Sequence, residues 1–274
     1  NQDGSILAVS AFLNDESAEN AGKTQVFERI NDQWVQKGKD ILGEGEGDRS
    51  RVTAISDDGS VIAVSSFNND NPNGGNAGHV RVYAFDGDEW TQKGTDIDGV
   101  STNDACGETA MNASGSVIAV GCSAYETVGR VRVFTYDGKD WAQTGASIDG
   151  EEEGDRSYRV ALNATGSILA IGSRDYGPGQ GQVRVFQLSS SNTWVQLGSS
   201  INGAVDWTYM GTSVSLSSDG LTLAVSGYSY YPGVSFTDDG RVKVYQYGND
   251  QWSQLGSTIV GESKGDEFGD EIAL

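Results

Sequence analysis

The sequence predicts an all-β protein, a five-bladed β-propeller in which each blade is a sheet of four antiparallel strands and residues 1–274 form a single domain. Three observations predict this fold. Two short motifs each recur five times in the same order, and no stretch of the chain keeps a helical period. The end of the chain also continues into its beginning as one further repeat.

The two motifs define the repeating unit. The first is a turn glycine followed by an apolar segment such as Ser60-Val61-Ile62-Ala63-Val64, and it recurs every 51 to 56 residues, at Gly4, Gly59, Gly115, Gly166 and Gly220. The second is Trp-x-Gln-x-Gly, which begins at Trp34, Trp90, Trp141, Trp194 and Trp252. We expect the five tryptophans to pack in the core between blades.

Each unit is predicted to contain four short strands separated by glycine-rich or polar turns. In the fourth unit we expect them at 159–163, 167–172, 182–187 and 193–198. The second strand is apolar on both faces, as expected for a sheet packed between two neighbours, whereas the third alternates, as in Arg130-Val131-Arg132-Val133. Sheets arranged around an axis fit this pattern.

The two ends of the chain predict how the ring closes. Ile272-Ala273-Leu274 followed by residues 1–5 would reproduce residues 161–167. We therefore expect the last segment to supply the first strand of the sheet whose other strands come from the N-terminal residues, so that no sheet edge stays open. The alternative, an open solenoid, requires distinct capping repeats, and none is visible.

The units resemble FG-GAP-type and kelch-like β-propeller repeats, and are most similar to the Trp-x-Gln-x-Gly repeat proteins found in secreted products of diatoms and marine bacteria. Phe268-Gly269 matches the FG half, and Val120-Gly121-Cys122 or Ile171-Gly172-Ser173 the GAP half. Integrin-like members carry an Asp-rich calcium loop. Here one connection has Asn69-x-Asn71-x-Asn73-Gly74, with amides in place of carboxylates, which argues against a cation site of that type.

Charge and composition exclude several classes of function. The chain has 18 Lys plus Arg and 39 Asp plus Glu, a net charge of −21, which disfavours nucleic acids and anionic lipid surfaces as partners. Its apolar runs are far shorter than the ~18 residues that a membrane-spanning helix requires, so no membrane insertion is expected. The one histidine, His79, excludes a His-rich zinc site, and its counterparts Lys23, Arg130, Gln182 and Arg241 predict a solvated polar position.

The cysteines and two glycosylation sequons bear on the compartment. Cys106 and Cys122 flank one hairpin and should face each other across its strands, as a disulfide or as two buried free thiols. The sequons at Asn112 and Asn163 fall in the same turn of two different units, where glycans are accepted if the turn is exposed. Together with the acidic charge, these features predict a secreted or cell-surface glycoprotein.

The binding face is predicted from loop lengths. The connections between second and third strands vary in length, and in a propeller they share one face with the connections that lead from one unit to the next. We therefore expect ligands to bind at this face.

An aspartate recurs in the connections that lead from one unit to the next. It lies five residues after the Gly that ends the fourth strand, in four of the five units: Asp48, Asp104, Asp155 and Asp266. This ring of carboxylates is a candidate Ca²⁺ site, the one cofactor that we predict. Alternatively, each Asp accepts backbone hydrogen bonds and shapes its own turn.

Other residues of the same loops are candidate ligand contacts. Arg49 and Arg156 follow two of these aspartates and are placed either to bind an acidic ligand or to form local ion pairs. Exposed aromatic rings beside carboxylates and amides are typical of sugar sites, because apolar sugar faces stack on rings while hydroxyls take polar bonds. The candidate rings are Trp207, Tyr209, Tyr228, Tyr230, Tyr231, Tyr125 and Tyr176, unless they only pack the long loops together.

Three functions are compatible with these features. The first is a secreted or cell-surface binding or adhesion module that recognises a carbohydrate or an extracellular glycoprotein through the loop face, with calcium as a candidate ligand. The second is a glycan-active enzyme of the glycoside hydrolase type. Catalysis needs different residues in each blade, whereas these units stay alike at their marker positions, which favours binding. The third is a structural spacer in an extracellular matrix or surface protein.

Overall fold

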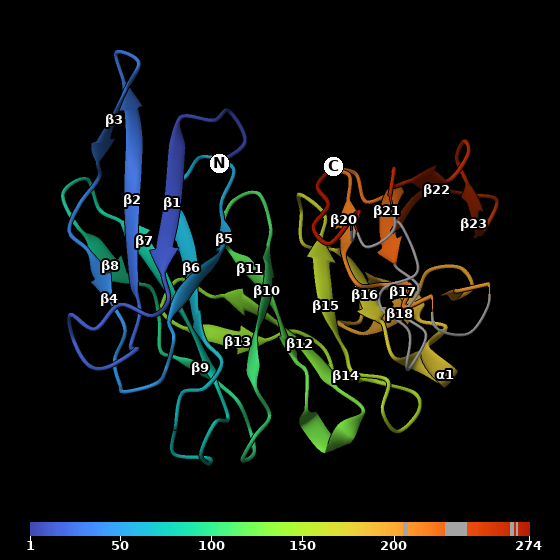
Figure 1. Cartoon of the computed structure of the whole chain (residues 1–274), viewed down its shortest axis with the longest axis horizontal. Coiled ribbons are helices and arrows are strands. Elements are labelled where there is room, and N and C mark those ends of the chain that lie inside the picture. Colours follow the sequence, from blue (N-terminus) through green and yellow to red (C-terminus); the bar gives the residue numbers. More distant parts are fainter. Residues whose placement is uncertain (205–207, 228–239, 264–265, 267) are drawn as a thin grey trace. The chain divides into compact units, whose positions relative to one another are not determined.

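In a computed structural model, the chain folds almost entirely into antiparallel β-sheets (Figure 1). The structure describes residues 1–204, 208–227, 240–263, 266 and 268–274. Helical structure within these residues is limited to one 3-10 turn, η1 (Tyr125–Thr127), and one short helix, α1 (Tyr176–Gly179). No helix in this described part has the length and apolar character needed to cross a membrane.

The chain divides into two compact units. Unit 1 contains Asn1–Tyr125 and Val133–Gln143, and unit 2 contains Glu126–Arg132 and Thr144–Leu274. Five antiparallel sheets are present in the described residues, as the repeats predict. The first two belong to unit 1, the last two to unit 2, and the third has strands in both. The prediction of one domain stays a prediction.

The strands follow the repeats in chain order. The first sheet contains β1 (Ile6–Ala11), β2 (Lys23–Ile30), β3 (Gln33–Gln36) and β4 (Ile41–Leu42). The second contains β5 (Arg51–Ile55), β6 (Val61–Ser66), β7 (His79–Phe85), β8 (Trp90–Gln92) and β9 (Ile97–Asp98). The third contains β10 (Cys106–Met111), β11 (Val117–Cys122), β12 (Arg130–Tyr136), β13 (Trp141–Gln143) and β14 (Ile148–Asp149).

The last two sheets repeat the same order. The fourth contains β15 (Ser157–Leu162), β16 (Ile168–Ser173), β17 (Gln182–Leu188), β18 (Trp194–Gln196) and β19 (Ile201–Asn202). The fifth contains β20 (Val214–Leu216), β21 (Thr222–Gly227), β22 (Arg241–Gly248), β23 (Gln251–Gln254) and β24 (Ile259–Val260).

The four strands predicted for the fourth unit are present, but the last is interrupted. Its two pieces, β18 and β19, both pair with β17, one at each end. The interruption is at Gly198, whose φ of +74° suits a residue without a Cβ. A Cβ at Gly198 would lie 3.1 Å from Cδ1 of Trp252, so the repeated glycine also makes room for the next tryptophan.

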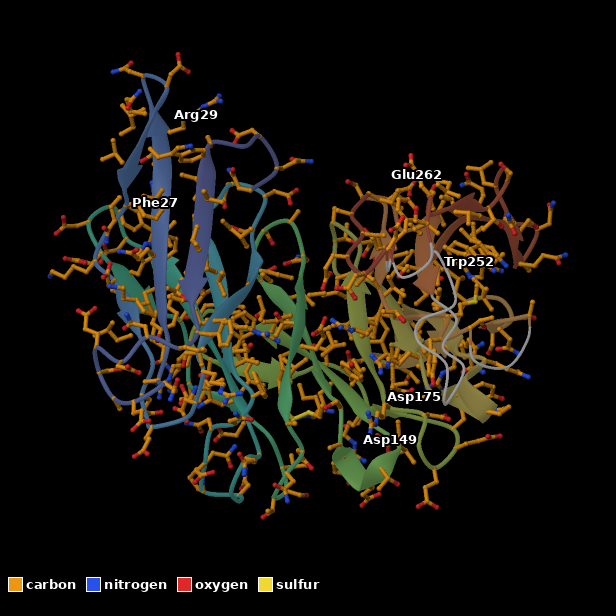
Figure 2. The ribbon with its side chains drawn as sticks, viewed as in Figure 1. Phe27, Arg29, Asp149, Asp175, Trp252 and Glu262 are labelled. Atoms are coloured by element: carbon orange, nitrogen blue, oxygen red, sulfur yellow. A yellow bond between two sulfur atoms is a disulfide. The ribbon has the colours of Figure 1, made fainter. Side chains whose placement is uncertain are left out.

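Each described tryptophan of the repeats after the first contacts the preceding sheet. The indole N–H donates to a backbone carbonyl one residue before the glycine of the previous motif, at 2.6–2.9 Å; the pairs are Trp90 with Lys37, Trp141 with Lys93, Trp194 with Thr144 and Trp252 with Leu197. Trp252 lies on β23 of the fifth sheet (Figure 2). These bonds confirm the prediction for four of the five repeated tryptophans, whereas Trp34 of the first repeat is 48% exposed.

A second repeated bond closes the turn before each second strand. The first amide of that strand donates to a side-chain oxygen five residues earlier, at 2.8–3.0 Å; the acceptors are Asn1, Ser56, Asn112, Asn163 and Ser217. Two of these acceptors are the sequon asparagines, which are only 4% exposed. The turns are as predicted, but the asparagine side chains are buried in them rather than presented to solvent. Glycosylation at Asn112 and Asn163 stays a prediction.

The C-terminal segment lies against the fifth sheet in the position of a next first strand. A Cβ at Gly240 would meet the backbone of Phe268 at 2.3 Å, just as one at Gly78 would meet the backbone of Cys106. The amides of Ile272 and Leu274 donate to the hydroxyls of two serines of the fifth unit, Ser213 and Ser215, at 3.3 and 3.0 Å. Residues 268–274 therefore occupy the place that a first strand takes beside its predecessor.

β1 differs from the other second strands. β6 and β16 are buried along their whole length, whereas β1 alternates between buried and exposed residues. Leu7 and Val9 are 43% and 48% exposed. In the described residues the first sheet contains no strand that precedes β1.

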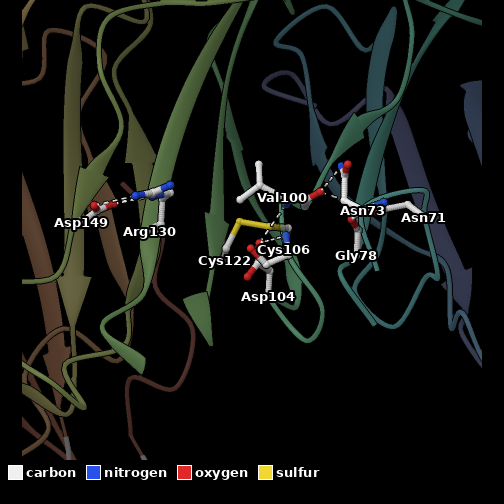
Figure 3. Close-up of a disulfide and its surroundings, with 11 residues drawn as sticks. Asn71, Asn73, Gly78, Val100, Asp104, Cys106, Cys122, Arg130 and Asp149 are labelled. Atoms are coloured by element: carbon white, nitrogen blue, oxygen red, sulfur yellow. Dashed lines mark hydrogen bonds and ion pairs between the residues drawn. A yellow bond between two sulfur atoms is a disulfide. The ribbon is translucent and has the colours of Figure 1, made fainter. Parts of the chain in front are cut away.

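Cys106 and Cys122 form a disulfide across β10 and β11, as the hairpin symmetry predicts (Figure 3). The equivalent positions in the second and fourth sheets hold hydrogen-bonded serine pairs, Ser50 with Ser66 and Ser157 with Ser173. The disulfide thus replaces a hydroxyl pair at one repeat of a common cross-strand position. It stabilises mainly by restricting the unfolded chain.

The repeated turn bond generates a stability prediction. We expect Asn112→Ala to lower the free energy of unfolding by about 2 kcal/mol, because two half-buried amides, of Ser116 and Val117, lose their acceptor. Asn112→Ser should lose less than about 1 kcal/mol, because serine performs this role in two other repeats. Urea denaturation of protein made in a host without N-glycosylation measures both changes. Equal losses in the two variants would contradict the proposed role of the acceptor.

Candidate functional site

A polar pocket lies in unit 1, where two loops of the predicted binding face meet. Its volume is about 480 Å³, and its lining residues are Glu44, Gly45, Glu46, Asp48, Asn69, Asp70, Asn71, Pro72, His79, Asp96 and Asp98. They come from the connection after β4, from the connection between β6 and β7, and from β7 and the segment around β9. The two kinds of connection predicted to share one face therefore line one pocket here.

Asp48 joins the two loops at the base of the pocket. It is 4% exposed, and its Oδ2 accepts hydrogen bonds from the Gly45 amide at 2.9 Å and from Nδ2 of Asn69 at 3.0 Å. Asn69 is itself buried, at 5% exposure. Because a buried acceptor and a buried donor satisfy each other here, the two loops are held in a defined arrangement.

Arg81 links two further acidic side chains of the pocket. Its Nε and Nη2 donate to the two carboxylate oxygens of Asp96 at 2.8 Å each, and Nη2 also donates to Glu44 at 2.9 Å. Burial by itself raises the pKa of Asp96, but the hydrogen bonds and positive charge of Arg81 outweigh it and hold this pKa below its ordinary value. The Asp96 carboxylate is therefore ionised at neutral pH, and Arg81 orients both carboxylates.

His79 begins β7, and the structure corrects its prediction as a solvated residue. Its side chain is only 4% exposed, and its Nδ1 lies 3.8 Å from Oδ2 of Asp96. Burial lowers the pKa of His79 below the ordinary value, and the negative charge of Asp96 offsets this in part. The imidazole therefore presents a neutral ring at the pocket wall at pH 7.

The sequence interpretation missed His79 and Asp96 because it took the features that the repeats share as its guide. The counterpart of His79 in the fourth sheet is Gln182, and the counterpart of Asp96 is Ser200. A site that is present in one repeat must be built from residues that the others lack. Asp40 stands at the position of Asp96 in the first repeat, so His79 alone departs from all the other repeats, and it was the available signal.

The four aspartates predicted as a calcium ring serve the backbone of their own turns. Asp104 accepts from the amides of Val100 and Ser101, and Asp155 from those of Glu151 and Glu152, all at 2.8–2.9 Å (Figure 3 shows Asp104). Asp48 and Asp266 each accept an amide three residues earlier in the chain. The alternative interpretation of these residues, a repeated turn, therefore accounts for their geometry, and calcium binding by them stays a prediction.

The structure describes three of the seven aromatic residues that the sequence predicts as ligand contacts. Tyr125, Tyr176 and Tyr209 are half-buried, and Tyr209 lies under the guanidinium of Arg174, 5.8 Å from its ring centre. Of the other aromatic candidates, four lie outside the described residues: Trp207, Tyr228, Tyr230 and Tyr231.

The two predicted arginine contacts do not take part in the pocket. Arg49 and Arg156 are exposed, and neither belongs to the pocket lining. Nε of Arg156 lies 3.7 Å from Asp175, which is the local ion pair of the alternative interpretation (Figure 2 labels Asp175).

The fold defines the chain as an all-β repeat protein of five antiparallel sheets, and comparisons with known proteins agree at that level. No family model and no curated protein sequence matches the chain. Among solved structures, it is similar to a periplasmic gluconolactonase, PpgL, from Pseudomonas aeruginosa, with a TM-score of 0.64 and 15% identity over 96% of this chain and 71% of that one. These figures establish likeness of fold.

Two other solved structures show the same likeness. A putative 6-phosphogluconolactonase from Bacteroides uniformis matches with a TM-score of 0.60 and 14% identity, over 96% of this chain and 84% of that one. Hydrazine synthase from Kuenenia stuttgartiensis matches with a TM-score of 0.55 and 14% identity, over 85% of this chain and 59% of that one. The arrangement of repeated sheets is thus shared by proteins whose names refer to different chemistry.

The role of Asp48 generates a prediction that separates turn formation from calcium binding. Asp48→Asn keeps an oxygen acceptor for Gly45 and Asn69, so we expect the free energy of unfolding to change by less than about 1 kcal/mol, whereas Asp48→Ala should lose about 2 kcal/mol. Thermal unfolding with and without added Ca²⁺ measures both effects. A stabilisation of the wild-type protein by Ca²⁺ that Asp48→Asn abolishes would instead establish the carboxylate as a metal ligand.

Proposed function

We propose that the protein is a secreted or cell-surface module that binds a neutral, polyhydroxylated ligand of the saccharide class in the pocket of unit 1. The observation that carries this proposal is the pocket itself, because among its lining residues only Gly45 and Pro72 lack a polar side chain. Its volume of about 480 Å³ falls in the range of small-molecule sites. Carboxylate and amide groups held at fixed positions suit the donors and acceptors of sugar hydroxyls.

The charge of the pocket restricts the ligand. Six carboxylates line it, those of Glu44, Glu46, Asp48, Asp70, Asp96 and Asp98, and Arg81 compensates only two of them. An anionic ligand such as a phosphorylated sugar would be repelled, because the net charge of the whole chain has the same sign. A neutral sugar or sugar derivative is therefore favoured.

The proposal also covers the cellular compartment and the closure of the five sheets into a ring. The disulfide favours an oxidising compartment, as the sequence analysis predicts. We also propose that the five sheets form a closed five-bladed β-propeller of the FG-GAP and kelch-like type. Residues 268–274 already take the position of a next first strand in unit 2, and β1 in unit 1 contains the strand edge that such a segment would complete.

The closed ring would also complete the tryptophan contacts. Trp34 is 48% exposed, and none of the described contacts gives its indole N–H an acceptor. Gly256, the glycine of the last motif, has no atom within 4 Å of the position of a Cβ. By analogy with the other four pairs, Trp34 would donate to the carbonyl of Leu255 and cover Gly256.

Hydrolysis of a sugar lactone is the second candidate function. It is favoured by the neutral imidazole of His79 beside Asp96, and by the names of two solved structures of similar fold. His79 would accept a proton from water as the water oxygen attacks the lactone carbonyl carbon. The ring C–O bond would then break, and the released alkoxide would take a proton, giving the hydroxy acid.

Glu46 provides the test of ligand binding, because its exposed side chain lines the pocket without contributing a described hydrogen bond to the fold. We expect an array of neutral glycans to reveal a ligand whose affinity, measured by calorimetry, falls about tenfold in Glu46→Gln. Glu153→Gln, the equivalent change in the fourth repeat, is the matched control and should bind like wild type.

Three outcomes separate the candidate functions. Binding without turnover supports the saccharide module, and EDTA in the same array, followed by separate addition of Ca²⁺ and Zn²⁺, reports which divalent ion binding requires. Consumption of glucono-δ-lactone that His79→Gln abolishes would favour the hydrolase instead. If no glycan binds and no lactone is consumed, both proposals are wrong and the structural spacer is favoured.

A further inference from the structure

His79, Glu44 and Asp96 form the one group of metal-ligating side chains, in the part of the chain that the structure describes, whose ligand atoms all lie within 4.8 Å of one another. They come from three separate segments, namely the connection after β4, the start of β7 and the segment before β9. All three line the pocket of the proposed saccharide site, and none of the four aspartates predicted as a calcium ring belongs to the group.

His79 distinguishes this group from an ordinary acidic cluster. Its side chain is 96% buried, lines the pocket and makes no described hydrogen bond, although a buried imidazole normally has a partner for its polar nitrogens. Its Nδ1 lies 3.8 Å from Oδ2 of Asp96, too far for a hydrogen bond. Two ligands of one tetrahedral ion lie about 3.4 Å apart, so the present spacing is close to that of a shared ion.

We propose that Glu44, His79 and Asp96 bind a divalent transition-metal ion, with Zn²⁺ the best match to a set of one imidazole and two carboxylates. Three protein ligands leave a fourth position for water or for an oxygen of a ligand in the pocket. The hard ions Ca²⁺ and Mg²⁺ prefer all-oxygen sites, so the imidazole selects against them.

Arg81 is the competing cation. Its guanidinium holds both carboxylates at 2.8–2.9 Å, so a metal ion must displace these bonds before it can bind. The Arg81 side chain is 21% exposed, so part of it contacts solvent. When the metal binds, a doubly charged ion replaces the singly charged guanidinium beside the carboxylates of Glu44 and Asp96. Because Arg81 competes for these carboxylates, it lowers the affinity for the metal.

The fourth repeat provides an internal comparison. Its equivalent positions hold Glu151, Gln182 and Arg184, so the carboxylate and the arginine are kept while the histidine is replaced by glutamine. Gln182 donates to Glu151 at 3.3 Å, and Nη1 of Arg184 lies 3.6 Å from the same carboxylate. The fourth repeat has Ser200 in place of Asp96, so His79→Gln reproduces its glutamine without reproducing the whole set; the fold already accommodates a glutamine at this position.

The test is titration of the EDTA-treated full chain with Co²⁺, followed by its displacement with Zn²⁺. We expect one ion per chain, a visible absorption band typical of mixed nitrogen and oxygen ligands, and a shift of the ring NMR signals of the one histidine. His79→Gln should weaken binding by at least about 100-fold, and Arg81→Gln should tighten it about tenfold. Thermal unfolding of both variants confirms that they fold.

Arg184→Gln is the matched control and should leave Co²⁺ affinity unchanged. The proposal is wrong if Co²⁺ binding survives in His79→Gln, if the histidine signals do not move on titration, or if the wild-type protein binds no ion. Should Arg81→Gln prove unfolded, Arg81→Lys replaces it: the proposal then predicts tighter binding, because lysine loses the bidentate contact with Asp96, and unchanged or weaker binding contradicts it.

Discussion

The contact on which the architecture depends is the hydrogen bond from a tryptophan indole to a carbonyl of the preceding sheet, made over a glycine. Trp141 illustrates it, with Nε1 2.6 Å from the carbonyl of Lys93 and its ring against Gly94. A side chain at that glycine would displace the ring, and a different aromatic residue would lose the bond. One five-residue motif thus sets the spacing of one sheet from the next, which explains why it recurs in every repeat.

The pocket of unit 1 follows from this spacing. Trp90 joins the second sheet to the first through the carbonyl of Lys37, beside the end of β7, and the pocket lies at the start of the same strand. Arg81 and Asp48 then hold the loops that line the pocket, through Asp96 and Asn69. The repeated contacts provide a rigid frame, and His79, which no other repeat has at this position, distinguishes this pocket from the equivalent places in the other repeats.

The features that could be predicted from the sequence are those that recur in every repeat or that depend on residues close together in the chain. The strands and the turns between them follow short patterns that recur five times, so the copies reinforced one another. The cysteine pairing occurs in one repeat and followed from the position of the two cysteines on either side of one hairpin turn. The burial of His79 could not be predicted, because it depends on the loop after β4, which is distant in sequence. The burial of the sequon asparagines could not be predicted either. Their turns are at the surface, yet the side chains of Asn112 and Asn163 point inward and accept hydrogen bonds from backbone amides.

In the closed ring that we propose, the same tryptophan contact would also join the two ends of the repeat array. The measurement is the loss of unfolding free energy in Gly256→Ala compared with Gly94→Ala, two glycines with φ of +73° and +78° and hence equal backbone strain. A Cβ at Gly94 would lie 2.7 Å from Trp141. A closed ring predicts the same loss at both sites, about 3 kcal/mol. A loss at Gly256 of about 1 kcal/mol, the cost of a left-handed alanine alone, would contradict closure.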